Sequence, residues 1–194
     1  MNATENIKKI IIKKPLKLDC GKTISNYPIA YETYGKLSEK KDNAILAFHA
    51  LSGDQFVTGT NPITNKSGWW SYLVGPNKAI DTNKFFVICS NVLGGCAGST
   101  GPKEKNSLTN KIYGGNFPSI TVRDMVKAQT YLIDALEIEK LFTVIGGSMG
   151  AMQTLQWSID YPDRIRSIIH IAGALKHSAQ NIAFHEVGRQ AIMN

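Results

Sequence analysis

A serine flanked by glycines at fixed spacing is the feature of this sequence with the clearest chemical meaning. Ser148 lies in the pattern Gly146-x-Ser148-x-Gly150, after a short apolar run and before a helix-forming segment. A tight strand–turn–helix of this kind holds a serine hydroxyl exposed in a strained backbone conformation. The start of the helix supplies N–H groups and a dipole that favour negative charge. The pattern predicts a nucleophile elbow; the alternative is a glycine-rich turn whose serine only caps the helix.

A second loop contains a candidate for stabilising the negative charge that forms when a serine attacks a carbonyl group. Residues 44–48 form a continuous apolar run, typical of a strand buried on both faces of a parallel sheet. In the loop that follows, we expect the N–H group of Leu51 to be an oxyanion donor, with Gly53 allowing close backbone approach. His49 is a candidate general base. We favour a histidine that orders this loop by hydrogen bonding, because the base usually follows the nucleophile along the chain.

A glycine-rich loop comes after another predicted strand, at residues 85–90. Its four glycines between residues 91 and 102 suggest a backbone shaped to approach another group closely. A phosphate cradle is one interpretation, although the Walker pattern is absent. Cys96 in this loop is a candidate nucleophile, but no base is visibly paired with it, and we favour a structural role.

The remaining elements alternate between strands and helices. Further strands are predicted at residues 16–18, 29–34 and 165–172, and helices at residues 151–159 and 181–193. Residues 121–124 have the form of a capping box, and the helix after them carries an apolar stripe interrupted by Gln129. This alternation predicts an α/β fold with a mostly parallel sheet and helices on both faces. The elbow narrows the prediction to the α/β-hydrolase fold.

The composition favours a single globular domain over residues 1–194. The 194 residues are 43% hydrophobic and 19% charged, with a formal net charge of +7. No basic run interleaved with aromatic residues indicates nucleic acid, and no apolar run is long enough for a membrane span or a signal peptide. The three cysteines are an odd number without metal-ligand spacing, so we expect a reduced, cytoplasmic protein without a bound metal.

The chain lacks obvious partners for Ser148. A serine nucleophile needs a histidine base oriented by a carboxylate, and in this fold the acid and then the base follow the serine. His170 lies within the strand predicted after the elbow helix, and His177 and His185 come directly after that strand. We therefore expect an N-terminal part of a longer enzyme, with the acid and base beyond Asn194. The C-terminal strands would be missing, and the sheet would expose an unpaired edge.

Several motifs together resemble the homoserine O-acetyltransferase family of the α/β-hydrolase superfamily, and the resemblance extends over nearly the whole chain from about Leu16. The motifs are His49-Ala50-Leu51-Ser52-Gly53, Asn91-Val92-Leu93-Gly94-Gly95-Cys96, Gly98-Ser99-Thr100-Gly101-Pro102, Thr121-Val122-Arg123-Asp124-Met125-Val126, Gly146-Gly147-Ser148-Met149-Gly150 and Ala179-Gln180-Asn181-Ile182-Ala183-Phe184.

The resemblance implies transfer of an acetyl group from acetyl-CoA to the hydroxyl group of L-homoserine, a reaction of methionine biosynthesis. Ser148 would form an acyl-enzyme, and the N–H groups of Leu51 and Met149 would hold the oxyanion. Acetyl-CoA is then a substrate, and no bound cofactor is expected. A lid that excludes water is implied, with residues 181–194 as its beginning, and the complete protein would be a homodimer. The family's catalytic Asp and His, and its homoserine-binding Arg, have no counterpart here.

Other functions remain open at this point. The acyl donor could be a succinyl thioester, which would make the protein a homoserine O-succinyltransferase. Water could be the acceptor, as in a serine esterase of the same fold. Because the base is missing, a catalytically inactive fragment that only binds or dimerises is a further alternative.

Overall fold

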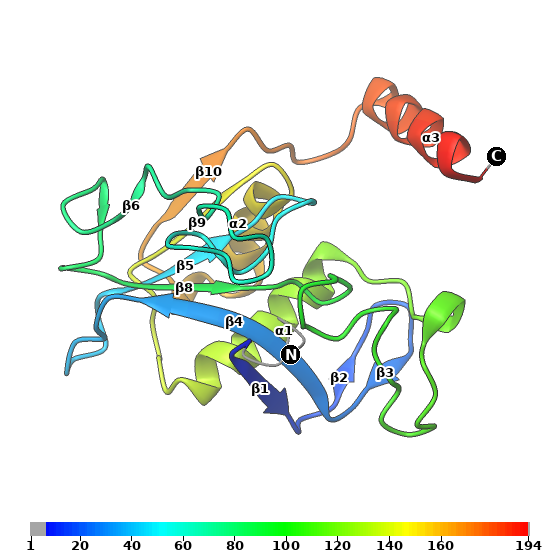
Figure 1. Cartoon of the computed structure of the whole chain (residues 1–194), viewed down its shortest axis with the longest axis horizontal. Helices are drawn as coiled ribbons and strands as arrows, with labels where there is room; N and C mark the ends of the chain where they lie inside the picture. Colours follow the sequence, from blue (N-terminus) through cyan, green and yellow to red (C-terminus); the bar gives the residue numbers. More distant parts are fainter. Residues whose placement is uncertain (1–6, 194) are drawn as a thin grey trace.

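The computed structural model describes residues 7–193, and its centre is a six-stranded sheet (Figure 1). Across the sheet the strands are β1 (Lys9–Ile12), β4 (Tyr27–Tyr34), β8 (Phe86–Ser90), β5 (Ala44–Phe48), β9 (Thr143–Gly147) and β10 (Ile168–Ile171). The last four run parallel, whereas β4 is antiparallel to both of its neighbours. The predicted α/β fold with a mostly parallel sheet is confirmed.

Short elements and three α-helices complete the described chain. Two small strand pairs are β2 (Leu16–Lys17) with β3 (Thr23–Ile24), and β6 (Val74–Gly75) with β7 (Ile80–Asp81). The α-helices are α1 (Val122–Ala135), α2 (Met149–Asp160) and α3 (Ala179–Met193), and short 3₁₀ turns are η1 (Gly114–Asn116) and η2 (Pro162–Arg164).

The two faces of the sheet are covered differently. Strand β5 is buried along its whole length, as predicted. Alternate side chains of β5 point to opposite faces of the sheet. On one face Leu46 packs in an apolar cluster with side chains of α1 and α2. On the other face Ile45 packs in a second cluster with Val74 and Trp69. Within the described residues the α-helices that pack on the sheet therefore cover one face only, whereas helices were predicted on both faces. The segment between β5 and β8 is rich in Gly, Pro and Asn, so it covers the second face with turns and the β6–β7 pair.

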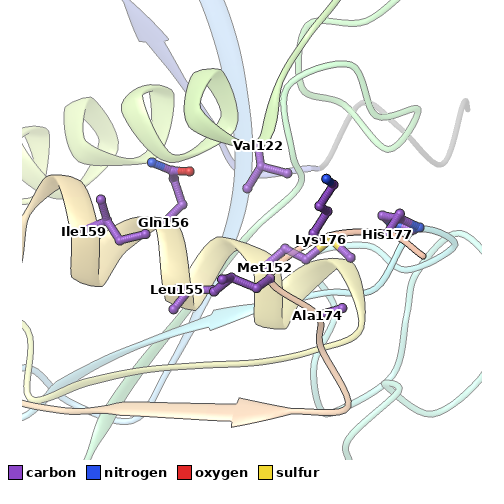
Figure 2. A pocket seen from close by; sticks show the side chains of 9 residues that line it. Val122, Met152, Leu155, Gln156, Ile159, Ala174, Lys176 and His177 are labelled. Atoms are coloured by element: carbon purple, nitrogen blue, oxygen red, sulfur yellow. The ribbon is translucent and has the colours of Figure 1, made fainter. Parts of the chain in front are cut away.

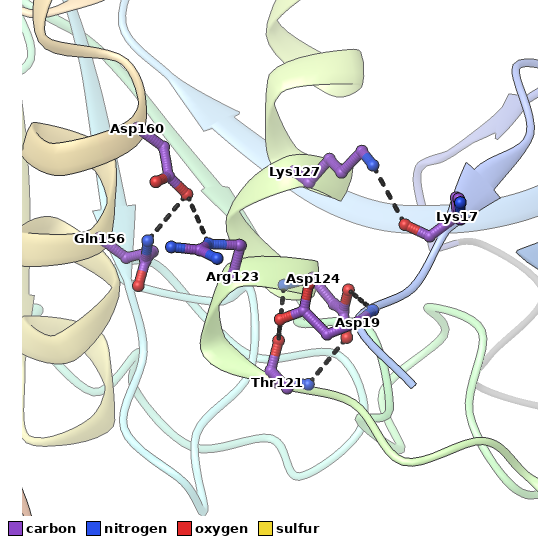
Figure 3. A network of polar contacts seen from close by, with 8 residues as sticks. All are labelled: Lys17, Asp19, Thr121, Arg123, Asp124, Lys127, Gln156 and Asp160. Carbon is purple, nitrogen blue, oxygen red and sulfur yellow. Dashed lines mark hydrogen bonds and ion pairs between the residues drawn. The ribbon is translucent and has the colours of Figure 1, made fainter. Parts of the chain in front are cut away.

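The start of α1 is fixed by the predicted capping box. The Thr121 side chain accepts a hydrogen bond from the N–H of Asp124, and the Asp124 carboxylate accepts one from the N–H of Thr121. The buried Asp124 also accepts from the N–H of Asp19, which ties the segment before β3 to the helix. Figure 3 shows these bonds together with the exposed pair of Arg123 and Asp160, which joins α1 to α2. Arg123 and Asp124 thus have structural roles at the start of α1.

Three polar side chains form a hydrogen-bonded chain buried between α1 and α2. Trp157 Nε1 donates to Gln129 Oε1 (3.1 Å), and Gln129 Nε2 donates to Gln153 Oε1 (2.7 Å). Gln153 Nε2 then faces the carbonyl oxygen of Met149 at 3.4 Å. This chain of bonds ends at Met149 in the first turn of α2, so the packing of the two helices is coupled to the turn that carries Ser148.

The C-terminal elements contribute little to the core. β10 lies at one end of the sheet, and its Ile168, Ile169 and Ile171 are between 37% and 45% exposed, although an apolar run of this kind is typical of a buried strand. The exposed outer edge agrees with the predicted unpaired edge. Helix α3 stands away from the sheet at the end of an extended connection (Figure 1), and none of its residues is buried.

The buried glutamines should be energetically coupled. Gln129→Met leaves the Trp157 indole N–H and the Gln153 amide without their partners, and we expect it to lower the free energy of unfolding by about 2 kcal/mol. Gln129→Met combined with Gln153→Met should cost clearly less than the sum of the two single changes. Urea unfolding of the three variants measures this, with Gln156→Met, at a partly exposed position of α2, as the control. If the stability loss of the double variant equals the sum of the two single losses, the proposed coupling is contradicted.

Candidate active site

Ser148 occupies a strained turn between β9 and α2. Its backbone angles are φ 56° and ψ −121°, in a region that non-glycine residues rarely occupy. Its N–H donates to the carbonyl oxygen of Ile171 on β10 (3.1 Å), and its own carbonyl accepts from Ala151 and Met152. The exposed side chain makes no capping hydrogen bond, so the alternative of a serine that only caps the helix is not supported. The strand–turn–helix geometry predicted around Ser148 is confirmed.

Two glycines of the elbow are required by close backbone contacts. A Cβ atom on Gly146 would lie 2.4 Å from the carbonyl carbon and oxygen of Gly150. A Cβ atom on Gly150 would lie 2.3 Å from the carbonyl oxygen of Phe48. The first turn of α2 therefore packs directly against the ends of both β9 and β5. Gly147 is different, because a Cβ atom placed on it would have its nearest neighbours 3.9 Å away.

The loop after β5 forms a tight turn around Leu51. The N–H of Gly53 donates to the carbonyl oxygen of Ala50 (2.9 Å), which closes a turn with Leu51 and Ser52 at its centre. A Cβ atom on Gly53 would lie 2.8 Å from the Cβ atom of His49, so a side chain at this position would collide with His49.

The two predicted oxyanion donors border one cavity. In the sheet Phe48 of β5 pairs with Gly146 of β9, so the loops after these strands start at the same level. Leu51 and Met149 both line an apolar cavity of about 250 Å³. The other lining residues are Val92, Leu93, Gly94, Gly95, Phe117, Pro118, Ile120 and Met125. Within residues 7–193 neither the Leu51 nor the Met149 N–H donates to a backbone acceptor, so both are free to bind an oxyanion.

His49 is buried behind the Leu51 turn and has the loop-ordering role that the sequence favoured. Its Nδ1 lies 2.7 Å from the carbonyl oxygen of Ala50, and its Nε2 lies 3.1 Å from the backbone nitrogen of Val92. Burial is the main cause that lowers the pKa of His49, while the Ala50 hydrogen bond and the charge of Asp54 act in the opposite direction. The ring is therefore neutral near neutral pH.

The glycine-rich loop is held by hydrogen bonds within itself and to β4, where the Thr100 N–H donates to the Pro28 carbonyl oxygen (2.9 Å). The Asn91 side-chain oxygen accepts hydrogen bonds from the N–H groups of Ala97 (3.1 Å) and Ser99 (3.4 Å). A Cβ atom on Gly101 would lie 2.2 Å from the carbonyl oxygen of Gly95. The close backbone approach that the glycines predicted is thus an approach within the loop, and its Val92–Gly95 part forms a wall of the cavity. The Cys96 side chain is exposed.

The described chain does not complete a catalytic triad. Within residues 7–193 the Ser148 hydroxyl has no hydrogen-bond partner on a histidine or a carboxylate. His170 Nδ1 instead faces the carbonyl oxygen of Ala151 (3.0 Å), and His177 stacks edge-on against His185 of α3, with ring centroids 5.2 Å apart. These described residues contain no group of three or more His, Cys, Asp and Glu side chains that could hold a metal ion.

A second cavity lies on the outer face of α2. It has a volume of about 220 Å³, and Figure 2 shows Met152, Leu155 and Gln156 of α2 on one side with Lys176 and His177 near its other end. Neither Ser148 nor Leu51 lines it, so it is separate from the cavity beside the elbow.

The fold and the elbow together define the class of protein. Residues 43–189 match the sequence profile of a family described as alpha/beta hydrolase fold. The chain belongs to this α/β-hydrolase family, as the sequence predicted. Within the described residues, no helix has both the length and the apolar character needed to cross a membrane.

Similar proteins carry the name that the motifs suggested. The chain is 66% identical over 193 residues to a homoserine O-acetyltransferase of Pelagibacter ubique (strain HTCC1062), covering 100% of this chain and 52% of that protein. A solved homoserine O-acetyltransferase from Bacillus anthracis is 35% identical with a TM-score of 0.83, over 89% of this chain and 48% of that one. The solved structure of esterase E22 is also 35% identical, with a TM-score of 0.84, over 93% of this chain and 51% of that one. The resemblance is confirmed, and the chain spans about half the length of the curated relatives it matches.

The elbow glycines offer a matched pair of substitutions. We expect Gly146→Ala to cost more than about 3 kcal/mol of stability or to prevent folding, because its methyl group would overlap the Gly150 backbone. Gly147→Ala, one residue away on the same strand, should stay within about 1 kcal/mol of the parent. Thermal and urea unfolding distinguish the two. Equal effects would contradict the packing described for the first turn of α2.

The buried neutral His49 predicts a pH dependence of stability. The unfolded chain takes up a proton at this residue near pH 6.5, whereas the folded chain does so only at lower pH, because its pKa is lowered. Its contribution to stability is therefore complete above about pH 6.5 and is lost as the pH falls below that value. We expect His49→Asn to reduce the loss of unfolding free energy between pH 7.5 and 5.5 by about 1 kcal/mol. The prediction is contradicted if urea unfolding shows the same loss of unfolding free energy between these two pH values in His49→Asn as in the parent protein.

Proposed function

We propose that this chain supplies the nucleophile half of an acyltransferase that moves an acetyl group from acetyl-CoA to the hydroxyl of L-homoserine. One observation carries the proposal: the strained, exposed Ser148 directly precedes Met149, which lines a cavity together with Leu51. Within residues 7–193 the N–H groups of Leu51 and Met149 have no backbone acceptor. The 66% identity to a homoserine O-acetyltransferase supports the choice of substrates. In this proposal the enzyme acts in methionine biosynthesis in the cytoplasm, as a homodimer.

The reaction would proceed in two transfers through an acyl-enzyme. Ser148 Oγ attacks the thioester carbonyl while a base takes its proton, and the negative charge on the carbonyl oxygen is held by the N–H groups of Leu51 and Met149. Collapse of this intermediate expels the CoA thiol and leaves acetyl-Ser148. The homoserine hydroxyl then attacks the ester, and the acetyl group leaves as O-acetylhomoserine. We place the base and its carboxylate beyond residue 194.

The acyl-enzyme must be protected from water for transfer to compete with hydrolysis. We propose that residues 181–194 begin a lid with this role. Helix α3 is the described part of this segment, and its exposed apolar side chains, Phe184 and Val187 among them, would suit a cover over an active site.

A serine esterase is the second candidate function. It is favoured by the similarity to esterase E22, which equals that to the solved acetyltransferase. In an esterase, water replaces homoserine as acceptor, so the two functions differ only in the second transfer. A succinyl donor and an inactive fragment are further alternatives. Assays of the full-length protein distinguish the two acyl donors and the esterase: kcat/KM is compared for acetyl-CoA with homoserine, for succinyl-CoA with homoserine, and for a simple aryl ester with water. The same assays on residues 1–194 alone test the inactive fragment.

Removal of the nucleophile should abolish the reaction without unfolding the protein. In the full-length protein we expect Ser148→Ala to lower kcat for acetyl transfer by roughly 10⁴-fold or more, because the residual rate comes only from binding and the oxyanion donors. Ser158→Ala, on the same helix, is the matched control and should leave kcat within about twofold. A Ser148→Ala variant with substantial turnover would rule out Ser148 as nucleophile.

A further inference from the structure

His49 contacts backbone groups of two different loops. It follows directly after β5, at the centre of the sheet, and its side chain is only 1% exposed. Its Nε2 faces the N–H of Val92 in the glycine-rich loop at 3.1 Å, and its Nδ1 faces the carbonyl oxygen of Ala50 at 2.7 Å. The Asn91 side-chain amide lies farther from Nε2, at 3.4 Å. Both ring nitrogens are therefore occupied by neighbours that belong to the framework of the site.

These partners determine the proton position on the ring. A backbone N–H can only donate, so Nε2 must be the acceptor for Val92 and carries no proton. A carbonyl oxygen can only accept, so Nδ1 must carry the proton and donate it to Ala50. A charged ring would place the N–H groups of His49 and Val92 against each other. With neither nitrogen free to take up a proton, His49 is not the general base for Ser148.

The Ala50 carbonyl and the Leu51 N–H are two ends of one peptide group. This group is planar and trans, so its oxygen and its N–H point in opposite directions. The oxygen accepts from two donors, His49 Nδ1 and the N–H of Gly53 at 2.9 Å, which together occupy its acceptor positions. Rotation of the peptide would break both bonds. A hydrogen bond to the carbonyl also polarises the peptide and strengthens its N–H as a donor.

We propose that His49 is a positioning residue that fixes and polarises the Ala50–Leu51 peptide, so that the Leu51 N–H is aimed for binding the oxyanion formed at Ser148. The inference rests on the proposed function, which assigns these roles to Ser148 and Leu51. The bond to Val92 anchors the ring to the glycine-rich loop, which forms a wall of the same cavity. The close approach of Gly53 to the His49 Cβ leaves no room for a side chain that would displace the turn from the ring.

Two substitutions in the full-length protein separate the two bonds of His49. In His49→Asn the amide nitrogen takes the place of Nδ1 and can still donate to Ala50, but the acceptor for Val92 is lost. In His49→Gln the amide oxygen can accept from Val92, but the donor to Ala50 is lost. In His49→Gln the Ala50 oxygen keeps the Gly53 N–H, whereas in His49→Asn the Val92 N–H loses its acceptor, so His49→Asn is expected to lose at least as much thermal stability as His49→Gln.

The rate at which a small aryl acetate acylates Ser148 is the readout, because it needs no homoserine. We expect His49→Gln to lower the acylation rate by roughly 10²-fold with little change in KM, and to weaken binding of a trifluoromethyl ketone, whose adduct carries an oxyanion, by a similar factor. His49→Asn should retain a rate within about fivefold of the parent. Equal rate losses in both variants, tracking their melting temperatures, would overturn the proposal and indicate a purely structural histidine.

The same experiment distinguishes failure of the proposed function from failure of the inference about His49. If the parent protein is acylated but passes the acetyl group only to water, the acetyltransferase proposal fails, and the comparison of the two His49 variants still tests the inference. If Ser148 of the parent protein is not acylated, both proposals are overturned.

Discussion

The close packing of the first turn of α2 against the ends of β5 and β9 is the constraint on which the site depends. The Phe48 carbonyl oxygen lies where a side chain on Gly150 would begin, and the Gly150 carbonyl lies where one on Gly146 would begin. Only glycines allow this distance, and the connection between β9 and α2 is then so short that Ser148 must adopt a positive φ. The strain at Ser148 is thus imposed by backbone contacts on both sides and serves to expose its hydroxyl.

Buried polar groups hold the surroundings of this turn in place. On the helix side, Gln129 and Gln153 connect α1 to the first turn of α2. On the loop side, His49 connects the Leu51 turn to the glycine-rich loop. Both networks are almost completely enclosed, where an unpaired polar group is costly, so each permits one arrangement of the backbone it touches. The site is therefore preorganised by residues that do not themselves reach the reacting atoms.

Much of this arrangement was predictable because it is local in the sequence. The elbow, the capping box at Thr121 and the fully buried strand β5 each have a signature within a few residues, and all are confirmed. The partners of Gln129 were not predicted, since Gln153 and Trp157 meet it only when two helices pack. An α-helix on the second face is absent from the described residues, because the segment after β5 that covers this face has turn-forming composition. The exposure of Ile168 on β10 depends on which segments pack against the faces of this strand, which its local sequence does not encode.

The central claim is that acetyl transfer passes through Ser148. The most direct test is to mix full-length protein with acetyl-CoA in the absence of homoserine, quench within one turnover, and locate the acetyl group by peptide mass spectrometry. The account predicts near-stoichiometric acetylation of Ser148, removed when homoserine is added before the quench. An acetyl group found instead on Cys96, or acetyl transfer to homoserine without any acetylated enzyme, would contradict it.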